Sequence, residues 1–125
     1  MNDARALFGS AALFNLLVAL SLTLAWPWTQ ALLQLDPSEG SNVLLRQVAA
    51  LLILTFGIAY GMVAVNASRY RAYVLLGIVG KSLVVVAAVP VIFQGGEGQM
   101  LAALAMGDLL YVLLFADFLR RTAPA

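Results

Sequence analysis

The chain has 125 residues, of which 63% are hydrophobic and only 10% are charged. In an ordinary soluble domain roughly a quarter of the residues are charged. Its 7 basic and 6 acidic residues give a net charge of +1, so no basic field is present to attract nucleic acid. Because the chain has no cysteine and no histidine, we expect no disulfide, no thiolate nucleophile, no metal site and no cofactor.

Four apolar segments are long enough to cross a membrane, which takes about 20 predominantly apolar residues. They cover residues 7–26, 43–65, 73–93 and 99–119 and nearly exhaust the chain. The connections between them are short and leave no room for a separate soluble domain. The sequence therefore predicts a single membrane domain over residues 1–125, an all-α integral membrane protein that forms a four-transmembrane-helix bundle.

The first segment begins after Arg5 and carries Asn15 about 12 Å inside the membrane. A cleaved signal peptide is the alternative interpretation, but the apolar core is too long for one and no A-x-A cleavage site follows it. The loop after this segment has leucines that could lie along the interface in a short helical turn: Leu32, Leu33 and Leu35. A plain surface connection is the simpler interpretation of this loop.

The second segment has a stripe along one face that contains several small residues, which is the pattern of a helix-packing surface in lipid. The stripe comprises Arg46, Ala50, Ile53, Gly57, Gly61 and Ala64. Gly57 and Gly61 form a GxxxG pattern, for which packing within the monomer is favoured over packing against a second copy. Arg46 lies about one turn from the outer end, where it acts as an interfacial anchor or meets an acidic outer residue: Asp36, Glu39 or Glu97.

The third segment contains GIVGKS, residues 77–82, which matches part of the phosphate-binding loop pattern. That loop requires a glycine at the position of Leu75 and a break between strand and helix, whereas this stretch is one continuous apolar run. Lys81 is therefore predicted to lie roughly 12 Å inside the cytoplasmic end of a membrane helix, on a face shared with Gly77. A central lysine costs about 2.5 to 3.5 kcal/mol, so a partner is expected. Pro90 either ends this helix early or bends it.

The fourth segment carries the expected partner, Asp108, at roughly 16 Å from the cytoplasmic end and within one helical turn of the depth of Lys81. Asn15 lies at a similar depth, so the three side chains are predicted to form one polar cluster. Tyr111, one turn from Asp108, is predicted to add a further hydrogen-bonding group. Gly77 and Ala105 should leave room beside the charges for water, a lipid headgroup or a ligand. We therefore predict a ligand-binding site formed by Asn15, Lys81, Asp108 and Tyr111.

The basic residues indicate the orientation, because lysine and arginine accumulate at the cytoplasmic ends of membrane helices. Arginines occur at the N-terminus, in the second loop and at the C-terminus, which share one side of a four-span protein: Arg5, Arg69, Arg71, Arg120 and Arg121. The charged residues of the other two loops are all acidic: Asp36, Glu39 and Glu97. We therefore predict that both termini are cytoplasmic. The high alanine and valine content and the short loops favour a bacterial inner membrane.

Two interpretations of the predicted polar cluster carry equal weight, a charge pair that fixes helix register and a functional site. The functional interpretation predicts a small membrane protein that binds or transports a small molecule or ion, in contact with membrane lipid and as a homodimer. The first alternative is a non-catalytic accessory or assembly subunit of a larger membrane complex. The second is a membrane enzyme that acts on a lipid or quinone. It is less favoured because the chain has no histidine, no thiol and no metal cluster with which to carry out catalysis.

Overall fold

The computed structural model describes residues 2–96 and 98–123, and these residues form helices and connections without any strand. The helices in chain order are α1 (Asn2–Ser21), α2 (Trp26–Leu33), α3 (Ser41–Val65), α4 (Arg71–Gln94), α5 (Gln99–Ala105) and α6 (Gly107–Arg121). Four helical stretches are long and apolar enough to cross a membrane: Asp3–Ser21, Ser41–Val65, Arg71–Gln94 and Gln99–Arg121. The prediction of an all-helical chain with four such helices is confirmed.

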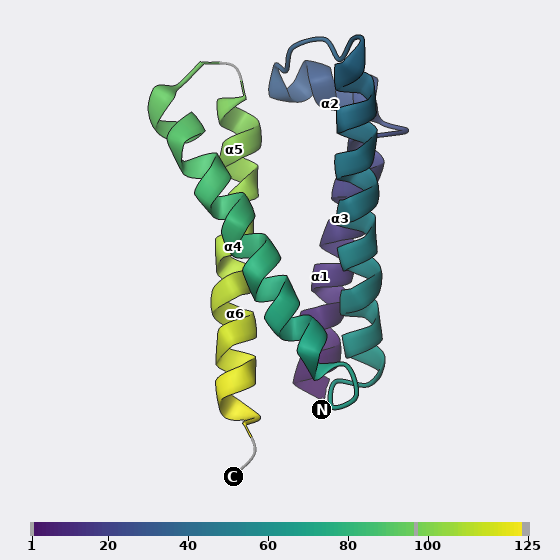
Figure 1. Ribbon diagram of the computed structural model, residues 1–125, viewed down its shortest axis with the longest axis vertical. Helices are drawn as coiled ribbons and strands as arrows, with labels where there is room; N and C mark the ends of the chain where they lie inside the picture. Colours follow the sequence, from purple (N-terminus) through teal and green to yellow (C-terminus); the bar gives the residue numbers. More distant parts are fainter. Residues whose placement is uncertain (1, 97, 124–125) are drawn as a thin grey trace.

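The long helices form two pairs. In the first pair α1 packs along α3, and in the second pair α4 packs along α5 and α6. The two pairs approach each other at the end that holds both termini and the α3–α4 connection, and they diverge toward the opposite end (Figure 1). Buried side chains from both pairs fill the first of these ends and form what we call the closed-end core: Ala4, Phe8, Ala11, Tyr60, Val63, Val74, Phe115 and Phe118.

The first long helix is shifted toward the N-terminus relative to its predicted span, residues 7–26. Helix α1 ends at Ser21, and a turn over residues 22–25 leads directly into α2. Pro27 explains this new start, because proline has no backbone N–H and is tolerated in the first turn of a helix, which is where α2 has it. The loop after the first span therefore contains a separate helix of 8 residues rather than a plain connection.

The third and fourth long helices keep their predicted extents to within a few residues. Helix α4 continues through Pro90 to Gln94, so the proline does not end it. The fourth predicted span is divided at Met106, where α5 ends and α6 begins. Met106 keeps helical backbone angles, with φ −65° and ψ −16°, and α5 and α6 therefore follow one another along a single line (Figure 1).

Two glycines allow helices to approach more closely than a side chain would permit. At Gly57 of α3 an added Cβ would lie 3.0 Å from the Cβ of Asn15 on α1, so this part of the GxxxG pattern packs within the monomer. At Gly61 nothing lies within 4 Å of that position. At Gly77 of α4 an added Cβ would lie 2.7 Å from Cε1 of Tyr60. The prediction that Gly77 leaves room for a ligand is therefore wrong, because aromatic rings occupy that space.

Arg46 of α3 connects the outer ends of α1, α2 and α3. Its guanidinium donates a hydrogen bond to the carbonyl of Leu22, and its Nε donates to the Ser38 hydroxyl at 3.2 Å. The guanidinium carbon also lies 4.6 Å from the centre of the Trp26 ring, which is a cation–π contact. Arg46 therefore makes specific contacts to the neighbouring helices, beyond those of a simple interfacial anchor.

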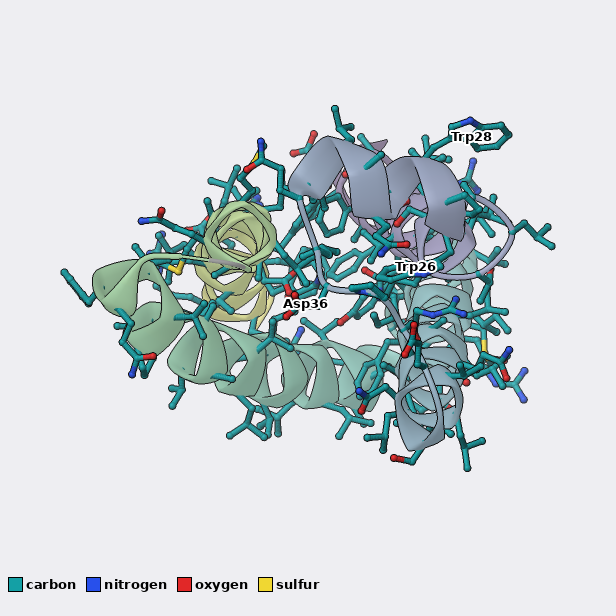
Figure 2. All side chains as sticks on the ribbon, turned by 90° about the horizontal axis from the view of Figure 1, so that it is seen from above. Trp26, Trp28 and Asp36 are labelled. Carbon is teal, nitrogen blue, oxygen red and sulfur yellow. The ribbon has the colours of Figure 1, made fainter. Side chains whose placement is uncertain are left out.

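The two acidic residues of the loop before α3 do not provide the partner that the sequence suggested for Arg46. Among the described residues Arg46 has no ion pair with Asp36 or Glu39. Its suggested contact with Glu97 lies outside the described residues. Seen from above, α2 lies across the outer end of the molecule and Trp28 points outward from it (Figure 2).

Candidate functional site

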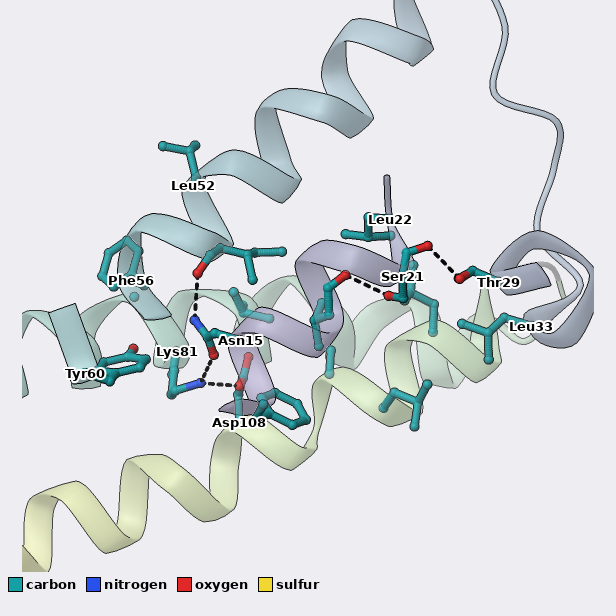
Figure 3. Close-up of a pocket in the computed structure, with 18 residues that line it drawn as sticks. Asn15, Ser21, Leu22, Thr29, Leu33, Leu52, Phe56, Tyr60, Lys81 and Asp108 are labelled. Atoms are coloured by element: carbon teal, nitrogen blue, oxygen red, sulfur yellow. Dashed lines mark hydrogen bonds and ion pairs between the residues drawn. The ribbon is translucent and has the colours of Figure 1, made fainter. Parts of the chain in front are cut away.

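A buried ion pair joins α4 to α6 in the middle of the apolar helices. Lys81 Nζ lies 2.7 Å from Asp108 Oδ1, and the two side chains are only 5% and 13% exposed. The same Nζ lies 3.4 Å from Oδ1 of Asn15 on α1. The predicted contact between Lys81 and Asp108 is therefore present, and Asn15 reaches it from the first helix pair (Figure 3).

The position of each charged residue makes the pairing necessary and favourable. Lys81 lies about 15 Å along α4 from the first residue of that helix, farther than its side chain extends, so the ammonium cannot reach the helix end. Asp108 lies in the first turn of α6, directly after the division between α5 and α6 at Met106. Each charge would be costly to bury alone, and each is stabilised by the other.

Asn15 is held in one orientation by the first helix pair. Its Nδ2 donates to the carbonyl of Ile53 on α3 at 2.9 Å, which turns Oδ1 toward the lysine. This approach is possible because Gly57 has no side chain where Asn15 meets α3. One amide group therefore connects α1 and α3 to the ammonium on α4.

Three aromatic rings surround the ammonium of Lys81. The ring centres of Tyr111, Tyr60 and Phe14 lie 5.1, 5.3 and 5.4 Å from Nζ, within the range of cation–π contacts. The hydroxyl of Tyr111 points elsewhere and donates to Ser10 Oγ at 3.1 Å. Tyr111 is therefore next to the cluster as predicted, but it contributes its ring rather than its hydroxyl.

A cavity of about 460 Å³ lies next to the ion pair, and this volume is typical of sites that bind small molecules. Lys81, Asp108 and Tyr60 lie at its inner end, and Thr29 and Leu33 of α2 lie at its outer end (Figure 3). All four long helical stretches contribute to its walls. These walls are mainly apolar and include Phe14, Val18, Leu22, Leu52, Ile53, Phe56, Val84, Leu101, Leu104 and Ala105.

Helix α2 covers the outer end of this cavity and is fixed to α1. The Thr29 hydroxyl donates to the carbonyl of Ser21 at 2.6 Å and also approaches the carbonyl of Ala25 at 3.0 Å. Thr29 and Leu33 are the two buried residues of α2, and both line the cavity. The short helix therefore directs its buried face toward the cavity.

Two polar atoms at the inner end have no hydrogen-bond partner within the described chain. Asp108 uses Oδ1 to bind the lysine and leaves Oδ2 free, and the Tyr60 hydroxyl makes no hydrogen bond. Only 9% of Asp108 and 1% of Tyr60 are exposed. Every fully buried polar side-chain atom in the described residues has a partner, so these two atoms keep some accessible surface. Both residues line the cavity, and the Tyr60 hydroxyl also lies against α4, where an added Cβ at Gly77 would be 3.0 Å from it.

Two aromatic members of the site, Phe14 and Tyr60, were missed from the sequence. Phe14 directly precedes Asn15, and Tyr60 follows Gly57 by three residues, which places it on the same face of α3. A phenol in the middle of an apolar segment was the available signal for Tyr60. Nothing in the sequence indicated that Phe14 would turn toward the lysine, because that depends on the distance between α1 and α4.

The chemistry of this site is that of a binding pocket with a polar inner end. Among residues 2–96 and 98–123 no group of three His, Cys, Asp or Glu side chains lies close enough to hold a metal ion. Comparisons with protein-family models, curated proteins and solved structures found no match to this chain.

Proposed function

We propose that the chain is an integral membrane protein of a bacterial inner membrane, with both termini in the cytoplasm. Four helical stretches of sufficient length and hydropathy support insertion. The two termini and the α3–α4 connection lie at one end of the molecule (Figure 1), and this end carries five of the six arginines. The positive-inside rule therefore favours this end as the cytoplasmic one.

Its proposed function is to bind a small, mainly apolar molecule in the cavity between the two helix pairs. The observation that carries this proposal is that the Lys81–Asp108 pair lies at the inner end of a cavity of about 460 Å³. An ion pair that only fixes helix register needs no such space, and close packing on all sides would serve it better. A cavity with apolar walls and a few polar groups at one end is the usual form of a small-molecule site.

Binding is better supported than passage across the membrane. The closed-end core lies between the cavity and the end that carries the termini, and its aromatic rings are in contact. Phe8 stacks on Phe115 with ring centres 4.7 Å apart and meets the edge of Phe118 at 5.1 Å. Transport would require these rings to separate, whereas binding from the outer end or from the lipid requires no such change.

If the cavity binds a small molecule from the native membrane, that molecule should remain bound when the protein is extracted. The protein is extracted with its surrounding lipid, and the bound small molecules are identified by mass spectrometry. Ala105 lines the cavity, so Ala105→Phe should fill it, whereas Ala103 is exposed and does not line it. We expect one compound class to be lost in Ala105→Phe and kept in the wild type and in Ala103→Phe.

The same preparation separates the proposed function from its alternatives. Identical small-molecule profiles in all three proteins would contradict binding in this cavity. Stoichiometric copurification with a larger membrane protein, together with such identical profiles, would favour an accessory subunit. Conversion of a lipid or quinone by the isolated protein, lost in Asp108→Asn, would favour an enzyme. The mass of the extracted particle also distinguishes the proposed homodimer from a monomer.

A further inference from the structure

We propose that the ligand of this cavity is a neutral amphiphile, specifically an apolar chain that ends in a hydroxyl group. This inference rests on the proposed binding function and names the class of molecule that binds. It concerns three properties of the cavity: its net charge, the polar atoms that it leaves unpaired and the direction in which it extends.

The charge of the cavity favours a neutral ligand. Lys81 and Asp108 are the only charged residues among those that line it, and their charges cancel. The pair stays neutral overall even if the proton moves from one group to the other. A carboxylate, phosphate or ammonium on the ligand would therefore add a third, unbalanced charge in an apolar environment, which is strongly unfavourable.

The unpaired atoms at the inner end favour a hydroxyl group. Oδ2 of Asp108 is a hydrogen-bond acceptor without a partner, and the Tyr60 hydroxyl can donate one hydrogen bond. Both residues adjoin the same ammonium, because Oδ1 of Asp108 binds it at 2.7 Å and the Tyr60 ring centre lies 5.3 Å from it. A ligand hydroxyl can donate to the carboxylate and accept from the phenol, whereas a purely apolar end would leave both unpaired.

The shape of the cavity favours a chain attached to that hydroxyl. Lining residues on α1 extend from Phe14 to Leu22, a rise of about 12 Å along the helix. Over this length the walls are mainly apolar, and the outer end is covered by Leu33 and Thr29 of α2. The hydroxyl therefore binds at the ion pair and the chain lies along the cavity toward α2.

The experiment uses four photoreactive probes with the same dodecyl chain and diazirine, namely an alcohol, an amine, a carboxylic acid and the alkane without a polar group. Purified protein in nanodiscs is labelled at neutral pH with each probe at equal concentration in the membrane. Labelled residues are then identified by mass spectrometry. We expect the alcohol to label the half-buried cavity residues Val18, Ile53 and Phe56 at least about tenfold more than either charged probe. Equal or stronger labelling by a charged probe in the wild type would overturn the inference.

Two charge variants provide a second, independent measurement on the same protein. In Lys81→Met the remaining carboxylate should shift the preference to the amine, and in Asp108→Asn the remaining ammonium should shift it to the acid. Tyr60→Phe removes the phenol hydroxyl and should reduce the preference for the alcohol over the matching alkane. An unchanged order of the probes in folded charge variants would overturn the inference as well.

The outcomes distinguish this inference from the function on which it rests. If a charged probe labels the cavity best and Ala105→Phe abolishes that labelling, the cavity binds ligands but their class is not the one proposed. If no probe labels the cavity above the lipid-facing residues, and Ala105→Phe and Ala103→Phe behave alike, the binding function itself fails. The wild-type comparison decides between alcohol, amine and acid even if a charge variant does not fold.

Discussion

Removal of one member of the Lys81–Asp108 pair should destabilise the protein far more than removal of both. The two atoms are 2.7 Å apart and their side chains are 5% and 13% exposed, so either charge would be left in an apolar environment without its partner. Breaking a buried pair from one side costs about 3 to 5 kcal/mol.

The double variant K81M/D108N carries no charge at this position and should recover much of that loss. We expect each single variant to lose about 3 kcal/mol and the double variant about 1 to 2 kcal/mol, so that the coupling free energy is about 4 to 5 kcal/mol. This exceeds the coupling of neutral hydrogen bonds between membrane helices, which averages about 0.6 kcal/mol. The ion pair has the larger coupling because each single variant leaves one charge unpaired, whereas loss of a neutral hydrogen bond leaves no charge unpaired.

The measurement is reversible unfolding in mixed micelles with increasing sodium dodecyl sulfate, followed by circular dichroism for all four proteins. Ligand-free preparations are compared, so that binding does not add to the stability of the wild type. A coupling free energy below about 0.5 kcal/mol, the scatter expected for independent sites, would refute the reasoning. It would mean that the pair is open to water and not closed off by the three rings.

Three further predictions test the packing, the outer cover and the topology. Gly77→Ala should lower the free energy of unfolding by about 1 to 3 kcal/mol because its Cβ would lie 2.7 Å from an aromatic ring, whereas Gly61→Ala should change it by less than about 0.5 kcal/mol. Equal effects in the same unfolding assay would contradict this packing. Arg46→Ala removes a charged donor to a backbone carbonyl, so amide hydrogen exchange should rise by about tenfold or more in α2 and stay unchanged in α4. The wild-type chain has no cysteine, so Glu39→Cys should react with an impermeant maleimide in intact cells, and Ser68→Cys only after permeabilisation. The reverse result would invert the topology.

The long helices and the ion pair could both be predicted from the sequence, but for different reasons. The helices follow from composition, because runs of about 20 apolar residues have few alternatives to a long helix. The ion pair follows from depth, because Lys81 and Asp108 lie within one turn of each other when counted from the same end. Counting depth works for neighbouring straight helices, and α4 and α6 are adjacent.

The cavity and the contacts of the Phe14 and Tyr60 rings could not be predicted from depth or composition, because they depend on how the helix pairs are placed relative to each other. The sequence suggested free space at Gly77 and Ala105, but Tyr60 fills the space at Gly77 and only Ala105 lines the cavity. Small residues indicate where a neighbour can approach, and they do not say whether a helix, a ring or a ligand takes the space. Pro27 had a similar effect on the first span, since it moved the end of α1 and produced the helix that covers the cavity.

The proposed ligand site also lies at the contact between the two helix pairs. Lys81 is bound to Asp108 within the second pair and to Asn15 in the first, so its ammonium lies at the contact between them. At 2.7 Å the bond to Asp108 is short, whereas the bond to Asn15 at 3.4 Å is long and correspondingly weak. A hydroxyl that donates to Asp108 would draw charge away from the carboxylate oxygens and weaken their hold on the ammonium. The lysine would then bind Asn15 more strongly, and occupancy of the cavity would draw the two helix pairs together.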